Sequence, residues 1–123
     1  MAIFGRFNEK AQQVIGAAQR AAVELGHSYV GSEHFLIGLL KAAREDAPAL
    51  PDNVIPETVI EAVKQITGTG EESPQQLELT PRVKKLLETS IREAQRLGQP
   101  YVTAGHFWLA LLQDEESVAM RVL

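Results

Sequence analysis

The side chains in this sequence that could bind a metal or act in acid–base catalysis include three histidines, His27, His34 and His106. The sequence has no His-Glu-x-x-His pair and no cysteine, which excludes a thiolate zinc site and a cysteine nucleophile. The stretch Gly68-Thr69-Gly70 has neither the spacing nor the lysine of a phosphate-binding P-loop. No nucleophile can be paired with a base. The sequence therefore predicts neither a catalytic site nor a bound metal or other cofactor.

The histidines themselves are better explained as structural residues. His34 and His106 occupy equivalent places in two similar segments, each at the start of an apolar run. An imidazole at such a place is expected to bond a backbone group near a helix start. His27 is aligned with Gln99 and is expected at the surface. A metal-dependent enzyme that uses the histidines is an alternative hypothesis, and metal analysis of the purified protein would test it.

Composition limits the class of protein further. The chain has 123 residues, of which 45% are apolar and 23% charged, so one packed domain is expected and wholesale disorder is excluded. Twelve basic and 16 acidic side chains give a net charge of −4, the wrong sign for a general nucleic-acid-binding protein. No apolar run approaches the ~18 residues that span a bilayer. We therefore expect a cytoplasmic protein that binds neither nucleic acid nor membrane.

An internal repeat organises the chain. Residues 7–40 align without a gap on residues 79–112, at a shift of 72 positions. Ten of these 34 pairs are identical: Arg20/Arg92, Ala22/Ala94, Leu25/Leu97, Gly26/Gly98, Tyr29/Tyr101, Val30/Val102, His34/His106, Phe35/Phe107, Leu39/Leu111 and Leu40/Leu112. We assign one domain over residues 1–123, with repeat one at 3–67, a linker at 68–78 and repeat two at 79–123.

Each repeat is predicted to be a helix, a tight loop and a second helix. The first helix has apolar residues at a period near 3.6, begins after the capping residue Asn8 or Thr80, and ends at Gly26 or Gly98. The second helices, at about 33–43 and 105–113, are apolar on most sides and should be central.

The remaining segments complete an all-α prediction. Pro56 should begin a third helix, and Pro48 and Pro51 favour a loop where repeat two shows a short helix over 118–123. No segment alternates as a half-buried strand should. The fold class is therefore all-α: two tandem helical repeats packed as a pseudo-dimer about an approximate two-fold axis, with neither half able to bury its apolar face alone.

The motif that occurs once in each repeat, together with the residues before each long helix, resembles a known protein family. Phe4-Gly5-Arg6-Phe7, the run from Leu25-Gly26-His27 to Gly38-Leu39 and Leu79-Thr80-Pro81-Arg82 resemble the N-terminal repeat domain of Clp-type AAA+ unfoldases, particularly the ClpC branch. The resemblance implies a domain that docks protein substrates and adaptor proteins for an ATP-driven unfoldase, which feeds a ClpP-type protease. ATP would bind to AAA+ modules outside these residues. A free-standing Clp-repeat adaptor without an attached ATPase is the alternative.

The resemblance also implies a ligand. Some ClpC N-domains bind phosphorylated arginine on proteins marked for degradation, with a glutamate for the guanidinium and a capped helix start for the phosphate. We expect one intact pocket, formed by Glu33, Asn8 and Ser32. The second pocket keeps Thr80 but has Gly105 in place of the acid, and is expected to be degenerate. The alternative to a ligand pocket is that Glu33 is only an acid in the first turn of its helix, where the helix dipole favours a negative charge. Asn8 and Thr80 would then only cap their helices.

An apolar seam between the repeats is the last candidate site. Phe4, Phe7 and Leu79 lie where the two copies should meet, and in related ClpC domains this seam is a docking surface for adaptors. Core packing explains Phe7 and Leu79 equally well, whereas Phe4 precedes the helix and is the better candidate for an exposed apolar contact.

Overall fold

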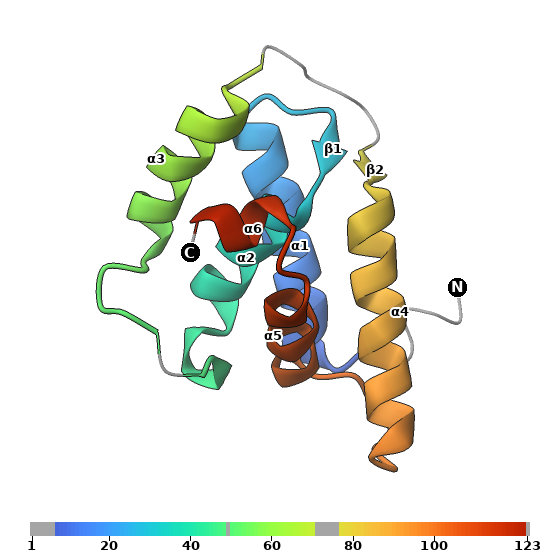
Figure 1. Cartoon of the computed structure of the whole chain (residues 1–123). Helices are drawn as coiled ribbons and strands as arrows, with labels where there is room; N and C mark the ends of the chain where they lie inside the picture. The colour runs from blue at the N-terminus through green and yellow to red at the C-terminus, as the bar shows by residue number, and fades with distance from the viewer. Residues whose placement is uncertain (1–6, 49, 71–76, 123) are drawn as a thin grey trace.

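The computed structural model describes residues 7–48, 50–70 and 77–122, and the regular structure in these ranges is helical apart from two strands of two residues each. In chain order the elements are α1 (Glu9–Glu24), β1 (Tyr29–Val30), α2 (Ser32–Ala42), the 3-10 helix η2 (Arg44–Asp46), α3 (Pro56–Thr67), β2 (Glu78–Leu79), α4 (Pro81–Arg96), α5 (Ala104–Gln113) and α6 (Val118–Val122). Figure 1 shows α3 and α4 on opposite flanks, with the other helices between them.

The ends of the two long helices confirm the capping predictions. The Asn8 side chain accepts a hydrogen bond from the Ala11 N–H at 2.8 Å, and Thr80 Oγ1 accepts one from the Val83 N–H at 3.2 Å. Past the ends of these helices, Gly26 and Gly98 have φ values of 71° and 70°. Glycine adopts this left-handed conformation without the steric cost of a Cβ, so both helices stop where the sequence indicates.

The two helices of repeat one lie against each other at unusually short range. A Cβ added to Gly38 in α2 would come within 2.7 Å of the Val14 carbonyl oxygen and 2.9 Å of the Ala18 nitrogen in α1. Only glycine permits this approach, because the atoms opposite belong to the backbone and cannot move aside. Gly38 therefore sets the close packing of α1 on α2.

The two repeats are joined crosswise. β1 pairs in parallel with β2, so Val30 of repeat one lies opposite Leu79 of repeat two, and an isolated parallel bridge joins Phe7 to Val102 (Figure 1). The Thr80 N–H donates to the Val30 carbonyl at 3.1 Å, and the Asn8 N–H donates to the Val102 carbonyl at 3.0 Å. The residue that caps the long helix of each repeat is thus hydrogen-bonded to the other repeat. The prediction of no strands is wrong at these two short segments, because two-residue strands are too short to show an alternating pattern.

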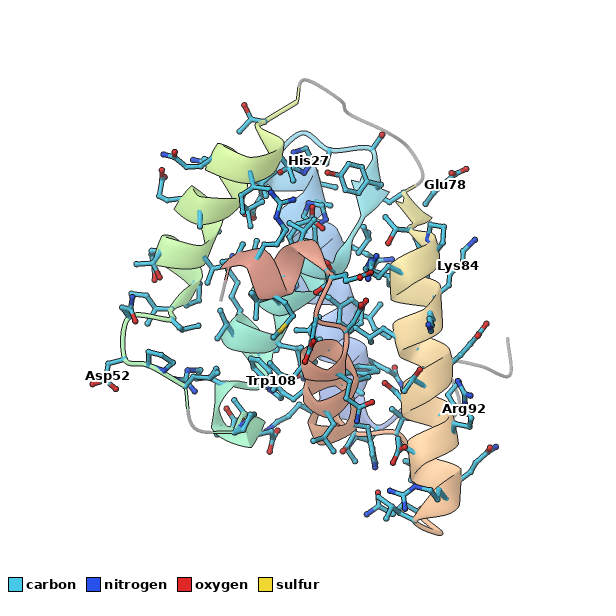
Figure 2. All side chains as sticks on the ribbon, viewed as in Figure 1. His27, Asp52, Glu78, Lys84, Arg92 and Trp108 are labelled. Atoms are coloured by element: carbon cyan, nitrogen blue, oxygen red, sulfur yellow. The ribbon has the colours of Figure 1, made fainter. Side chains whose placement is uncertain are left out.

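Aromatic rings fill the centre of the molecule. The Phe107 ring meets Phe35 edge to face, with centroids 5.2 Å apart, and lies 5.7 Å from Phe7. Trp108 is buried and its indole N–H donates to the Ala43 carbonyl at 2.9 Å (Figure 2). These contacts join α5 to repeat one, so the all-α prediction with central second helices is confirmed.

Candidate functional site

Two histidines have the structural role that the sequence predicts. His34 Nδ1 accepts a hydrogen bond from the Gly31 N–H at 2.9 Å, and His106 Nδ1 accepts one from the Thr103 N–H at 2.9 Å. Each ring thereby caps its helix. Burial, with a smaller effect of His27, lowers the pKa of His34 to about 3, so its ring is neutral at neutral pH.

His27 differs from expectation. It is 6% exposed, whereas the sequence predicts a surface residue, and its ring lies between His34 and the Gly68 carbonyl. Gly68 is 41 positions away in the chain, so local pattern carries no sign of this contact. Figure 2 shows His27 where the end of α3 approaches the start of β1.

The predicted pocket of Asn8 and Glu33 is wrong, because these residues lie at opposite ends of a helix hairpin. Lys10, in the first turn of α1, forms ion pairs with Glu45 and, at 3.3 Å, with Asp46, both beyond the end of α2. Glu33 is in the first turn of α2. An 11-residue helix is about 16 Å long, which separates the start of α1 from Glu33.

The crosswise joining brings different residues together. The hydrogen bond from Thr80 to Val30 places the start of α4 beside the loop that leads into α2 and Glu33. The corresponding bond from Asn8 to Val102 places the start of α1 beside the loop that leads into α5 and Gly105. The threonine cap and the glutamate, which the sequence assigned to separate pockets, therefore fall on one side of the molecule.

Glu33 is a buried acid. It is 3% exposed, and among the described residues no lysine or arginine lies within salt-bridge distance of it. Burial raises the pKa of its carboxyl group, against weaker opposing effects of its own N–H, His27 and the Tyr29 hydroxyl. Its side chain folds back so far that a Cβ at Gly31 would overlap Oε1.

The other predicted pocket residues have different surroundings. Ser32 is 4% exposed, and its hydroxyl oxygen accepts a hydrogen bond from the Ala119 N–H at 3.3 Å, so it secures α6. At Gly105 the nearest atom to an added Cβ would be Thr103 Oγ1, at an ordinary 3.5 Å. A Cβ would therefore fit at Gly105 without displacing any neighbour.

A hollow opens at the start of α4, and sequence analysis missed part of it. Its lining consists of Thr80, Pro81, Arg82, Lys85, Asp114 and Glu116. Arg82 forms an ion pair with Asp114, and Lys85 adds a second cation beside the helix N-terminus. Their spacing along α4 was the available signal, since Arg82 is the second residue of that helix and Lys85 lies nearly one turn further on.

Phe7 and Leu79 each pair with the other repeat, Phe7 with Val102 and Leu79 with Val30, but Phe7 is only 3% exposed and belongs to the core. Leu79 is partly buried against that core, and Phe4 lies outside the described residues. Exposed large apolar side chains occur in both repeats among the described residues: Leu97, Tyr101 and Leu109 of repeat two are 50%, 54% and 51% exposed, and Val23 and Ile55 of repeat one are 49% and 41% exposed.

The described part of the chain contains neither a metal-binding cluster nor a membrane-spanning helix. Over residues 7–48, 50–70 and 77–122, no group of three or more histidine, aspartate or glutamate side chains could hold a metal ion. No helix in those ranges combines the length and the hydrophobicity needed to cross a bilayer.

The similar helical units, the crosswise bridges and the paired histidine caps show a duplicated helical repeat domain. The family model of the Clp repeat (R) N-terminal domain matches residues 6–123, and the chain belongs to this family. This confirms the family resemblance seen in the sequence.

Relatives and solved structures agree with that assignment. The chain is 41% identical over 125 residues to the negative regulator of genetic competence ClpC/MecB of Bacillus subtilis, and 40% identical over 123 residues to the chaperone protein ClpB of Oceanobacillus iheyensis. Each match covers 98% of this chain and 15% of the relative. The N-terminal domain of ClpD from Arabidopsis thaliana superposes with a TM-score of 0.81 at 25% identity, covering 98% of this chain and 84% of that one.

Proposed function

We propose that this domain docks protein substrates and adaptor proteins for a Clp-type unfoldase in regulated proteolysis. Membership of the Clp repeat family supports the proposal, as does the identity to ClpC of Bacillus subtilis. The chain spans about 15% of that relative's length, so ATP hydrolysis and contact with a ClpP-type protease belong to the complete unfoldase. The domain's own contribution is binding.

The ligand that suits the site is phosphoarginine on a protein. The observation that carries this proposal is the hydrogen bond from the Thr80 N–H to the Val30 carbonyl, which brings the start of α4 to the loop that leads into Glu33. A helix start offers unpaired N–H groups and about half a positive charge to a phosphate. In the hollow at the start of α4, Lys85 strengthens this attraction, whereas Arg82 is already paired with Asp114 and Glu116 adds a second acid. A guanidinium would supply the positive charge that the buried Glu33 carboxylate lacks, through paired charge-assisted hydrogen bonds.

The equivalent site at the start of α1, beside the loop that leads into Gly105, should bind phosphoarginine far more weakly. It pairs Asn8, which caps as well as threonine, with Gly105, which has no acid. A hydrogen bond to a charged group contributes roughly 1.5–3 kcal/mol. Since about 1.4 kcal/mol is a factor of ten, the missing anchor weakens this side by about 10- to 100-fold or more. We therefore expect one competent pocket, formed by Thr80 and Glu33.

Isothermal titration with phosphoarginine tests both statements. We expect one equivalent per chain, with affinity lowered about 10- to 100-fold by Glu33→Ala. Free arginine should bind more weakly, because it brings no phosphate to the start of α4. Two equal sites in the unmodified chain, or undiminished binding by Glu33→Ala, would refute the single-pocket proposal.

A gain-of-function variant gives a sharper version of the same titration. Gly105→Glu adds the missing acid where the structure has room for a Cβ, so a second equivalent should appear. Gly105→Ala is the matched control, since it makes the same change in helix propensity without adding a carboxylate. One equivalent with Gly105→Glu would show that the pairing across the repeats does not create the pocket.

A further inference from the structure

The residue before the second helix has the same backbone conformation in both repeats. Gly31, which precedes α2, has φ −104° and ψ 179°, and Thr103, which precedes α5, has φ −113° and ψ 169°. These are extended conformations that any residue can adopt. Both backbone N–H groups also donate to the histidine three residues on, at 2.9 Å. Neither the backbone nor the helix cap therefore requires a glycine at position 31.

The space above Gly31 is filled by the carboxylate of Glu33. A Cβ at position 31 would overlap Glu33 Oε1 and would lie 3.0 Å from its Cδ. The carboxylate interacts there with its own N–H and with the Tyr29 hydroxyl, and Glu33 is only 3% exposed. The absence of a Cβ at Gly31 is therefore what allows Glu33 to fold back over the loop.

This folded-back position directs the acid towards the other repeat. Gly31 follows Val30, whose carbonyl accepts a hydrogen bond from the Thr80 N–H at 3.1 Å. A carboxylate that lies over Gly31 is therefore beside the residue to which the start of α4 is bonded. If Glu33 swung away from the loop, its carboxylate would leave this place.

The corresponding space in repeat two is occupied. Thr103 carries the Cβ that Gly31 lacks, and its Oγ1 lies 3.1 Å from His106 Nδ1. Since the two loops have the same conformation, a glutamate at position 105 that was folded back as Glu33 is would overlap Thr103. Repeat two thus lacks both the acid and the space that the acid needs.

We propose that Gly31 is a positioning residue of the phosphoarginine pocket, which keeps the Glu33 carboxylate folded back beside the start of α4. Gly31 acts through Glu33 and need not touch the ligand. By the same argument, Thr103 and Gly105 together make the second site degenerate. The binding consequences of this inference rest on the proposed function, whereas the pairing of Gly31 with Glu33 can be measured without a ligand.

The substitution Gly31→Ala tests the positioning role. The backbone suits alanine, and the atom displaced is the end of a flexible side chain, so the domain should fold with Glu33 swung away from the loop. Isothermal titration should show phosphoarginine affinity lowered about 10- to 100-fold, as for Glu33→Ala. Thr103→Ala, at the aligned position, is the matched control and should bind as the unmodified chain does. Undiminished binding by Gly31→Ala would overturn the proposal.

A double-mutant cycle separates positioning from a general effect on the fold. If Gly31 acts only through Glu33, adding Gly31→Ala to Glu33→Ala should change the remaining affinity by less than about twofold. If the two losses instead multiply in the double variant, Gly31 acts independently of Glu33 and the positioning role is wrong.

Carbon NMR of the Glu33 carboxyl group gives a readout that needs no ligand. Burial raises the pKa of this group in the unmodified chain, and in Gly31→Ala the displaced carboxyl should titrate nearer its ordinary 4.5. An unchanged pKa would refute the pairing of Gly31 with Glu33. If the unmodified chain does not bind phosphoarginine, the proposed function fails, while a lowered pKa in Gly31→Ala still supports the pairing.

The aligned positions in repeat two permit the opposite experiment. Gly105→Glu alone supplies an acid that cannot fold back as Glu33 does, so its added equivalent should bind more weakly than the first. Adding Thr103→Gly should strengthen that second equivalent about tenfold or more, because a charged hydrogen bond becomes available. Thr103→Gly alone makes space without an acid and should leave one equivalent. A double variant that binds the second equivalent no more tightly than Gly105→Glu would contradict the proposal.

Discussion

Glu33 is an acid whose burial works against the folded state at neutral pH. Because its pKa is raised above the ordinary 4.5, the folded state holds the proton more tightly than the unfolded state does. The stabilisation from protonated Glu33 is complete below about pH 4.5 and is lost as the pH rises through the folded-state pKa. A residue that costs stability at neutral pH is expected where binding requires it.

The neutral substitution Glu33→Gln should therefore stabilise the domain at pH 7. We expect a gain of about 1 kcal/mol, because a buried amide avoids the desolvation of a carboxylate. The stability difference between the variant and the unmodified chain should shrink towards pH 4. Urea unfolding at several pH values measures it, and a variant that is less stable at pH 7 would contradict the argument.

Local chemistry made several residues predictable, while contacts between distant segments did not. Asn8, Thr80 and the two capping histidines act within three residues of themselves, so their roles could be inferred from the sequence. His27 was misplaced because its partner Gly68 comes from the far end of α3. The pocket of Asn8 with Glu33 failed for a related reason, since the sequence shows the repeat but not which ends of the helices meet.

At the scale of elements, the two repeats differ most in how far other helices cover their apolar side chains. α3 and the segment after it lie over repeat one, where Leu25 is 5% exposed and Ile37 is fully buried. The equivalent residues of repeat two, Leu97 and Leu109, are about half exposed. Sequence alone suggests equal roles for these aligned leucine and isoleucine positions. The difference comes from packing, because the described part of repeat two has no counterpart of α3.

This asymmetry predicts unequal effects of matched substitutions. Ile37→Ala should destabilise the domain by about 2–5 kcal/mol, because it leaves a cavity in the core. Leu109→Ala, at the aligned position, should cost no more than about 0.5 kcal/mol, since half of that side chain is already in water. Thermal or urea unfolding of both variants provides the comparison, and similar losses would show that the exposed face of α5 is covered in solution.

The helices were predictable from pattern to within about a residue, and the strands were not. The second helices were expected at 33–43 and 105–113 and lie at Ser32–Ala42 and Ala104–Gln113. Their apolar runs and capping residues are local signals. β1 and β2 exist only because Val30 and Leu79 meet when the repeats assemble. Their hydrogen bonds are a consequence of the tertiary structure rather than of strand propensity.

On the scale of the whole molecule, the crosswise bridges make the two halves depend on each other. Phe7 is held by repeat two and Leu79 by repeat one, while the Trp108 indole bonds the Ala43 carbonyl across the core. Neither half keeps these contacts alone, and each would expose the apolar faces of its helices.

Fragments of the chain should therefore complement each other. We expect residues 1–70 and residues 77–123 to be largely unfolded when separate and to gain helical structure when mixed. Circular dichroism of each fragment and of an equimolar mixture measures this. A fully helical, cooperatively unfolding fragment 1–70 would show that repeat one is an independent folding unit, contrary to this expectation.

The N-termini of α1 and α4 are each bridged to the other repeat, which is the geometry of a fused homodimer. A single ancestral helix–loop–helix unit could make both parallel bridges only by associating with a second copy of itself, as an isologous two-fold interface requires. Joining the two copies in one chain removed the concentration dependence of that association. The two copies are no longer identical, since His27 aligns with Gln99 and Glu33 with Gly105.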